Sequence, residues 1–394
     1  MSLHGVPASQ RVHIAFFGRT NAGKSSVVNQ VTGQSLSLVS EISGTTTDPV
    51  MKTMELLPLG PVVIIDTAGM DDNTPLGQMR EKKTIQILHK TDIALLIVDA
   101  TVGMMDRDKS LIEELKRYDI PYILVYNKMD LLKEVPKALD NEIYVSALTG
   151  DNIFELKEKI AALMHNPQNE KLIMKDILSP GDLVLLVVPV DDAAPKGRLI
   201  LPQQMVLREI LDCHALAVVV QNTEVKDALS RFTEVPKMVI TDSQAFEQVA
   251  KDVPDDIYLT SFSILMARYK GNLSQAVNAA RSIDHLKDGD KVLISEGCTH
   301  HRQCWDIGTV KLPYWLNKYT GKKLNYEFTS GREFPEDLSG YALVIHCGGC
   351  MLNEKEMQYR YDHAQNMQVP ITNYGICIAH LKGILERSLE LFSI

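Results

Sequence analysis

Two groups of residues in this 394-residue sequence have types and spacing that can do chemistry. Residues 18–25 read Gly-Arg-Thr-Asn-Ala-Gly-Lys-Ser, the G-x-x-x-x-G-K-S pattern of a phosphate-binding loop. Residues 298–300 and 346–350 read Cys-x-His and His-Cys-x-x-Cys, which supply side chains that bind soft metals. The chain therefore combines a predicted phosphate site with a predicted metal site.

The phosphate loop follows an apolar run and begins a helical pattern, which is the context that this motif requires. Its glycines let backbone N–H groups surround a phosphate at the positive end of the helix dipole. Lys24 is expected to neutralise the β- and γ-phosphates, and the Ser25 hydroxyl is expected to ligate Mg²⁺. The residues expected to contact the nucleotide here are Gly18, Asn21, Ala22, Gly23, Lys24, Ser25 and Ser26.

Two further segments supply groups for the γ-phosphate and the metal. Asp66 begins an Asp-Thr-Ala-Gly motif after an apolar run, and its carboxylate can hold Mg²⁺ through water while the Gly69 N–H contacts the γ-phosphate. Thr45 and Thr46 supply the hydroxyl that a nucleotide switch places on the metal. The residues expected to act in hydrolysis are Asn21, Lys24, Thr46 and Gly69.

A third motif predicts which base is bound. Asn127-Lys128-Met129-Asp130 follows another apolar run, and the Asp130 carboxylate can accept two N–H donors from guanine. Adenine cannot offer that pair of donors. Ser146 and Ala147, after the last predicted strand of this region, complete base recognition. The sequence therefore predicts GTP and GDP rather than ATP as the nucleotides.

In order and spacing these motifs resemble the translation-factor-like GTPases. Asn21 and the run Gly44-Thr45-Thr46-Thr47-Asp48 resemble, within that class, the TrmE, Era and Der group. This resemblance implies that Asn21 binds K⁺ and that K⁺ stimulates hydrolysis, although an Asn in a turn also stabilises loops by hydrogen bonding. Met70 stands where small GTPases carry a water-orienting glutamine, so we expect slow hydrolysis unless K⁺, dimerisation or a partner completes the site.

The two cysteine-containing segments each follow a predicted strand. Parallel neighbouring strands would bring both segments to one edge of a sheet. The thiols of Cys298, Cys347 and Cys350 suit an iron–sulfur cluster, because thiolates are soft ligands and the glycines at 348 and 349 let backbone N–H groups approach sulfide.

The sequence leaves the fourth ligand of such a cluster open. His300 or His346 could fill that position, and Glu296 is a weaker candidate. A structural zinc site built from the same two segments is an alternative, and a redox dithiol of the Cys-x-x-Cys pair is another. Cys304 and Cys377 are predicted to be small buried hydrophobes rather than ligands.

Alternating strand and helix patterns predict the elements that position these residues. Over residues 9–168, strands are expected at 13–17, 62–65, 93–98, 122–126 and 143–145. Helices are expected at 24–31, 76–89, 109–117 and 152–164. The alternation implies a mainly parallel, doubly wound sheet that binds its ligands at the carboxyl ends of its strands.

The rest of the chain also predicts α/β structure. A boundary is expected between residues 165 and 182, where Asn, Pro and Gly gather. We predict a P-loop GTPase domain followed by two smaller α/β domains with parallel sheets, at residues 1–168, 176–269 and 270–394. The middle domain lacks a catalytic constellation, since Cys213 and His214 alone are too few ligands for a metal, so we interpret it as a dimerisation or interaction module.

Composition and hydropathy argue against a non-specific nucleic-acid binder, a membrane protein and a secreted protein. The sequence is 45% hydrophobic and 23% charged, with a net charge of -9 that disfavours non-specific binding to nucleic acid or to anionic membranes. It contains no apolar run of about 18 residues that could span a bilayer, and residues 1–10 lack the pattern of a secretion signal. We therefore expect a cytoplasmic protein without a membrane partner.

The combination of these parts resembles the HydF family of FeFe-hydrogenase maturation GTPases over essentially the whole chain. The resemblance assigns cluster ligation to Cys298, Cys347 and Cys350, with His300 and His346 as the motif histidines. It implies a dimeric scaffold that binds a 4Fe-4S cluster, receives a transient di-iron precursor from radical-SAM maturases and delivers it to apo FeFe-hydrogenase. The alternative is a ribosome- or RNA-associated GTPase with a structural zinc tail.

Overall fold

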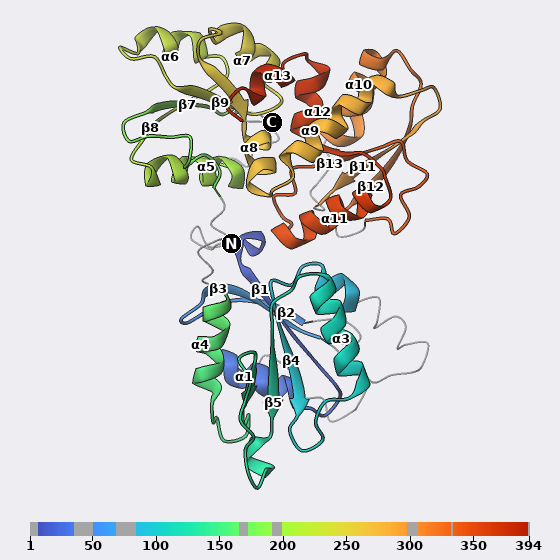
Figure 1. The fold of residues 1–394 in the computed structure, drawn as a ribbon. Helices are drawn as coiled ribbons and strands as arrows, with labels where there is room; N and C mark the ends of the chain where they lie inside the picture. The colour runs from blue at the N-terminus through green and yellow to red at the C-terminus, as the bar shows by residue number, and fades with distance from the viewer. Residues whose placement is uncertain are drawn as a thin grey trace. The chain divides into compact units, whose positions relative to one another are not determined.

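A computed structural model describes residues 7–34, 50–67, 84–164, 172–190, 199–297, 306–331 and 334–392. Within these ranges the strands form a six-stranded sheet and two four-stranded sheets (Figure 1). The chain divides into two compact units, residues 1–170 with 353–356 and residues 171–352 with 357–394, and both four-stranded sheets belong to the second unit. The predicted α/β class with mainly parallel sheets is confirmed.

The first unit contains the six-stranded sheet, in the order β2-β3-β1-β4-β5-β6. Neighbouring strands are parallel except for β2, which is antiparallel to β3. The strands span β1 (Val12–Gly18), β2 (Val50–Leu56), β3 (Gly60–Asp66), β4 (Ile93–Asp99), β5 (Tyr122–Asn127) and β6 (Glu142–Tyr144). Strand β2 was not predicted from the sequence.

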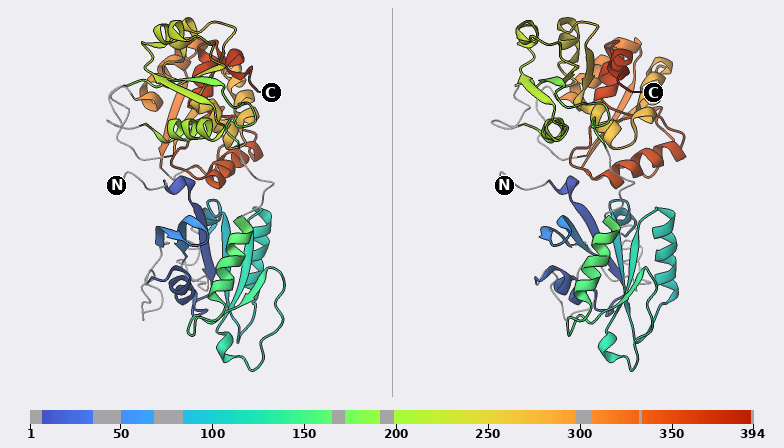
Figure 2. Two further views of the ribbon diagram at one scale, coloured as in Figure 1. Left: turned by 90° about the vertical axis from the view of Figure 1, so that its left-hand side faces the viewer. Right: turned by 60° about the vertical axis from the view of Figure 1, so that its left-hand side comes forward.

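Helices cover both faces of this sheet because alternate side chains of each strand point to opposite faces (Figures 1 and 2). Ile14 and Phe16 of β1 pack with α1 (Lys24–Thr32) and α4 (Ile153–Met164). Phe17 packs on the other face with α3 (Asp106–Arg117). Residues 84–88 are helical, whereas the rest of the helix predicted at 76–89 lies mostly outside the described residues.

The second unit begins with the sheet β10-β9-β7-β8, in which all pairs are parallel. Its strands are β7 (Leu183–Val187), β8 (Leu216–Val220), β9 (Met238–Thr241) and β10 (Tyr258–Ser261). Its helices are α5 (Leu201–Asp212), α6 (Val225–Arg231), α7 (Phe246–Asp252) and α8 (Phe262–Tyr269).

The last sheet has the order β12-β11-β13-β14 and is also parallel throughout. Its strands are β11 (Lys291–Glu296), β12 (Asn325–Ser330), β13 (Leu343–His346) and β14 (Ile371–Asn373). The helices are α9 (Leu273–Arg281), α10 (Leu312–Thr320), α11 (Glu354–Asn366), α12 (Tyr374–Leu381) and α13 (Leu385–Leu389), and a π-helix (Ile307–Lys311) precedes α10. Val239 of β9 and Leu293 of β11 belong to one buried hydrophobic cluster, so the two four-stranded sheets share a core.

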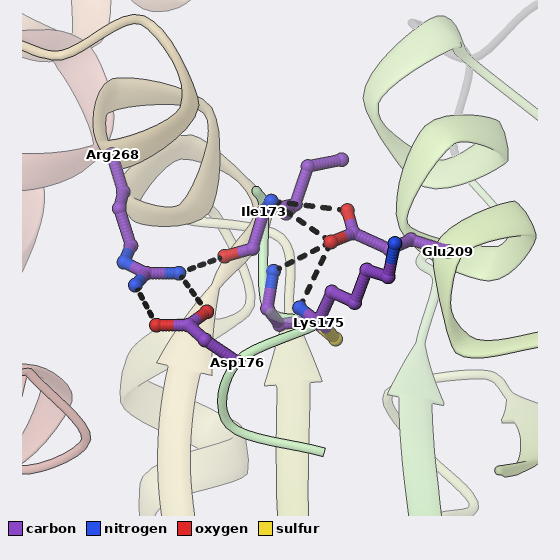
Figure 3. A network of polar contacts seen from close by, with 6 residues as sticks. Ile173, Lys175, Asp176, Glu209 and Arg268 are labelled. Atoms are coloured by element: carbon purple, nitrogen blue, oxygen red, sulfur yellow. Dashed lines mark hydrogen bonds and ion pairs between the residues drawn. The ribbon is translucent and has the colours of Figure 1, made fainter. Parts of the chain in front are cut away.

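The first described residues of the second unit are fixed by a polar network (Figure 3). The Glu209 carboxylate on α5 accepts backbone N–H bonds from Ile173, Met174 and Lys175 at 2.9–3.1 Å. Arg268 on α8 donates to the Ile173 carbonyl oxygen at 2.7 Å and pairs with Asp176. Two helices of the second unit therefore hold the segment at which the unit begins.

None of the helices in the described ranges has both the length and the apolarity needed to cross a bilayer.

Candidate functional site

The phosphate loop connects the end of β1 to the start of α1, at the carboxyl edge of the sheet (Figure 1). Gly23 has φ +83°, and a Cβ there would lie 2.2 Å from Asn127 Nδ2. A Cβ at Gly18 would lie 2.5 Å from the Ile97 carbonyl oxygen. Both positions therefore need glycine, because the loop backbone approaches β4 and β5 too closely for a side chain.

Groups suited to Mg²⁺ lie beside this loop. Strands β1 and β3 are parallel neighbours with Phe16 opposite Asp66, so the Asp66 carboxylate lies at the same edge of the sheet as the loop. Its oxygens lie 3.2 Å from Lys24 Nζ and 3.4 Å from the Ser25 Oγ. A hydroxyl and a carboxylate so placed fit the oxygen ligands that Mg²⁺ prefers.

Asn127 joins the phosphate loop to the base-recognition loop. Its side chain is 2% exposed, donates a 3.0 Å hydrogen bond to the Ala22 carbonyl oxygen and accepts another of 3.0 Å from the Ala147 N–H. The buried Ser146 hydroxyl donates to Asp130 Oδ1 at 2.6 Å. The exposed Asp130 carboxylate is thereby oriented by the loop that follows β6, as guanine recognition requires.

Lys128 forms an ion pair that the motif alone did not predict. Its Nζ lies 2.5 Å from Asp99 Oδ2 at the end of β4. Burial raises the pKa of Asp99, but hydrogen bonds from Lys128 and Thr101 outweigh burial and hold that pKa below its ordinary value. Asp99 therefore stays ionised and fixes the direction of the Lys128 side chain.

The structure places Gly18, Asn21, Ala22, Gly23, Lys24, Ser25 and Ser26 in the loop and first turn that the motif predicted. Asn21 is exposed and has φ +65°, a backbone conformation that asparagine tolerates. Thr45, Thr46, Gly69 and Met70 lie outside the described residues, so their roles stay predictions.

At the other predicted site, the ends of β11 and β13 meet. These strands are parallel neighbours with Ser295 opposite His346, and the Cys347 N–H donates to the Ser295 carbonyl oxygen at 2.8 Å. The Gly297 N–H, just after β11, lies 3.0 Å from the Cys347 sulfur. The segments that contain the two halves of the cysteine motif therefore begin side by side at one edge of the sheet.

The Cys347 thiol lies in a cradle of backbone N–H groups. The Gly349 N–H also points at this sulfur, at 3.4 Å. A Cβ at Gly297 would lie 2.8 Å from Leu352, and a Cβ at Gly349, where φ is +59°, would lie 2.4 Å from the Met357 sulfur. Burial raises the pKa of the Cys347 thiol, while both N–H donors favour the thiolate. Thiolate sulfur with peptide N–H donors is the donor set that iron–sulfur clusters use.

The remaining predicted ligands differ in their placement. Cys350 is exposed, and Cys347 is half-buried. Cys298 and His300 lie outside the described residues, and within the described ranges no three His, Cys, Asp or Glu side chains converge as a metal site. Cys377 is fully buried in the core, as predicted for a small hydrophobe.

His346 is held by the protein at both ring nitrogens. Arg360 donates to Nε2 at 2.8 Å, so the proton is on Nδ1, which lies 2.6 Å from the Cys347 carbonyl oxygen. Burial, together with the Arg360 charge, lowers the pKa of His346 to about 3. The expectation that His346 could supply the fourth cluster ligand is therefore not favoured by this geometry. The Glu296 carboxylate at the end of β11 accepts from the Tyr374 hydroxyl at 3.2 Å.

Lys270 and Arg360 are the site residues that no motif indicated. Lys270, which is 9% exposed, donates to the carbonyl oxygens of Gly348 and Gly349 at 3.3 and 2.6 Å. It directly follows α8 and lies 78 residues before Gly348 in the sequence, so only the tertiary fold brings the two together.

A phosphate loop after β1, an aspartate at the end of β3 and an Asn-Lys-x-Asp motif that begins at the last residue of β5 define the first unit as a P-loop GTPase domain. A family model described as 50S ribosome-binding GTPase matches residues 13–128 of this unit. Models described as the hydrogen maturase F dimerization and tetramerization domains match residues 173–271 and 274–391. The chain belongs to the HydF family of hydrogenase maturases.

Other known proteins are similar to the GTPase part. The tRNA modification GTPase MnmE of Legionella pneumophila (strain Paris) is 39% identical over 160 residues, which are 40% of this chain and 35% of that protein. GTPase Der of Kosmotoga olearia is 34% identical over 166 residues, 37% of each chain. The match thus spans about a third of the length of these curated relatives.

Among solved structures, a variant of Aquifex aeolicus Era bound to GDP.AlF4- is 20% identical to this chain, with a TM-score of 0.35. The match covers 61% of this chain and 97% of that one.

Proposed function

We propose that this protein is a GTP-hydrolysing scaffold that carries a 4Fe-4S cluster and delivers a di-iron subcluster to apo FeFe-hydrogenase. The observation that carries the proposal is the cradle of N–H groups around the Cys347 sulfur, in a chain whose residues 173–271 and 274–391 match hydrogen maturase domains. Radical-SAM maturases would supply the di-iron precursor, which is cargo rather than a resident group. GTP and reduced thiols are both available in the cytoplasm, where we propose that this chemistry occurs.

The GTPase site would bind GTP through the phosphate loop and Mg²⁺ through Ser25, Thr46 and Asp66. Water attacks the γ-phosphorus, the bond between that phosphorus and the bridging oxygen breaks, and GDP and phosphate leave. Lys24 and the loop N–H groups neutralise charge on the phosphates. Met70 cannot orient the attacking water, so we propose slow hydrolysis that K⁺ on Asn21 stimulates.

The cluster would be held by the thiolates of Cys298, Cys347 and Cys350, with His300 or Glu296 as candidates for the fourth position. When bound, it would supply an iron that can accept another metal fragment. The chain itself provides soft ligands and N–H donors to sulfur.

We propose three domains: a GTPase at 1–168, a dimerisation domain at 176–269 and a cluster domain at 270–394. Strand β8 supports a homodimer through the middle domain, because it is an edge strand with only β7 as its neighbour in the described sheet. Its Leu216 and Val219 are large apolar residues that are 58% and 45% exposed. Apolar edges of this kind favour pairing with another chain.

In this proposal the GTP cycle controls partner contacts. The γ-phosphate can hold switch loops in one state, and hydrolysis releases them, so nucleotide state changes the affinity for a partner. No contact of the nucleotide with the cluster is required.

A reciprocal pair of variants tests this assignment. Lys24→Ala should abolish GTP binding and leave iron and sulfide uptake intact, because its side chain acts on phosphates. Cys347→Ala should abolish cluster uptake and leave GTP hydrolysis intact. Loss of both properties in either variant would contradict two separable sites, and tightly bound zinc without sulfide in the wild type would favour the zinc-tailed GTPase instead.

A further inference from the structure

The carbonyl oxygens of the loop Cys347-Gly348-Gly349 all accept hydrogen bonds from buried groups. The His346 Nδ1–H donates to the Cys347 oxygen at 2.6 Å. Lys270 Nζ donates to the next two oxygens along the chain, at 3.3 and 2.6 Å. Three successive peptide groups are therefore fixed by donors on the carbonyl side.

The geometry of the peptide bond then sets the direction of the N–H groups. In a trans peptide the C=O and the following N–H point in opposite directions. The N–H groups of Gly348, Gly349 and Cys350 therefore point away from the donors that hold the three carbonyls. The Gly349 N–H accordingly lies 3.4 Å from the Cys347 sulfur. Lys270 thus turns the positive ends of the last two of these peptide dipoles away from its own charge, toward the side on which the thiol lies.

Two positive charges are buried around this loop. Lys270 is 9% exposed and Arg360 is 1% exposed. Burying a cation is unfavourable unless nearby groups offset the lost hydration. The carbonyl oxygens of Gly348 and Gly349 stabilise the Lys270 charge, and the two positive charges in turn favour an anionic group on the thiol side of the loop. An iron–sulfur cluster bound by three thiolates is such a group.

We propose that Lys270 is a positioning residue for the cluster: it holds the Gly348 and Gly349 carbonyls so that the Gly349 N–H faces the Cys347 sulfur, and its charge raises the reduction potential. This inference rests on the proposed cluster site. Adding one electron from an external reductant such as dithionite makes the cluster more negative, so a buried positive charge and aligned N–H dipoles favour the reduced form.

The test uses the whole 394-residue chain, reconstituted anaerobically with iron and sulfide. The variants are Lys270→Met, which removes both the charge and the donors, and Lys270→Arg, which keeps both. Lys287→Met is the matched control, because Lys287 is an exposed lysine of the same unit. Iron and sulfide content and the reduction potential are measured, the latter by a titration followed with electron paramagnetic resonance.

We expect Lys270→Met to lower the ratio of reduced to oxidised cluster about tenfold at fixed potential, which for one electron is a shift of about 59 mV to lower potential. Lys270→Arg should stay near the wild-type potential, and Lys287→Met should match it. If thermal unfolding shows that Lys270→Met is not folded, Lys270→Gln replaces it, with the same expected direction.

A folded Lys270→Met or Lys270→Gln protein with wild-type cluster content and wild-type potential would overturn the role of Lys270. So would a Lys270→Arg protein whose potential falls as far as that of Lys270→Met. A wild-type protein that takes up no iron and sulfide would instead overturn the proposed function.

Discussion

Replacing Asn127 with alanine should disconnect the phosphate loop from the base-recognition loop. The Asn127 amide contacts the Ala22 carbonyl oxygen and the Ala147 N–H, both at 3.0 Å. The three residues are 2%, 2% and 8% exposed, so water cannot readily take the place of the amide. The variant therefore leaves a buried carbonyl and a buried N–H without their partner.

The size of the effect follows from these two groups. Each buried polar group left without a partner costs about 1–3 kcal/mol, so two of them cost about 2–5 kcal/mol after partial relaxation. If the loops can no longer hold their binding geometry, the free energy of GTP binding becomes less favourable by this amount. Since about 1.4 kcal/mol is a tenfold change, the GTP dissociation constant should rise by about 30-fold to a few thousandfold.

The assay is titration of a fluorescent GTP analogue into the whole 394-residue chain. Asn141→Ala is the matched control, because Asn141 is an exposed residue of the same unit. The Leu124 N–H donates to the backbone oxygen of Asn141, and the substitution keeps that oxygen. The control should bind as the wild type does. An Asn127→Ala protein that is folded and binds with wild-type affinity would refute the claim that this amide couples the two loops.

Three further predictions concern single residues. Asn21→Gly should keep nucleotide binding but lose the stimulation of GTP hydrolysis by K⁺, because glycine tolerates φ +65° yet lacks the amide oxygen. If K⁺ still stimulates hydrolysis in this variant, Asn21 only shapes the loop. Glu209→Gln should speed hydrogen exchange of the 173–175 amides about tenfold or more, because hydrogen bonds to a charged acceptor contribute about 1.5–3 kcal/mol each. The control Glu234→Gln, at an exposed position, should leave this exchange unchanged. Equal exchange rates in the two variants would contradict the role of Glu209 in holding this segment. Hydrogen bonding from Arg268 holds the pKa of Asp176 below 3.8, so the pair stabilises the fold above that pH and the contribution is lost as the pH falls through the lowered pKa. Urea unfolding of the wild type and Asp176→Asn should therefore differ at neutral pH and converge in acid, and a constant difference would contradict this linkage.

The parallel strands of the first unit were predictable because they are buried on both faces. Such strands are nearly continuous apolar runs, as in Ile93–Asp99, and the motif residues follow them directly. Strand β2 was missed because it is an edge strand with mostly exposed or half-buried residues, so it has no apolar run. Helix α8 could not be recognised from an amphipathic pattern, because residues 264–267 are all buried and the period of a surface helix is lost.

The candidate cluster site was predictable only in part. The spacing of cysteines after two strands indicated that the two segments share a sheet edge, and the pairing of β11 with β13 provides the contact. The hydrogen bonds of Lys270 and Arg360 depend on how α8 and α11 pack against the 347–350 loop, which no local pattern records. His346 looked like a ligand because its residue type fits, but its two nitrogens bind Arg360 and the Cys347 carbonyl oxygen.

The most direct test of a GTPase that carries an iron–sulfur cluster is anaerobic reconstitution of the wild type beside Cys298→Ala. Metal and sulfide analysis is followed by electron paramagnetic resonance of the reduced protein. We expect about four irons and four sulfides per chain in the wild type, with a reduced-cluster signal that is lost or altered in the variant. Tightly bound zinc with no sulfide would contradict the assignment of an iron–sulfur cluster to this chain.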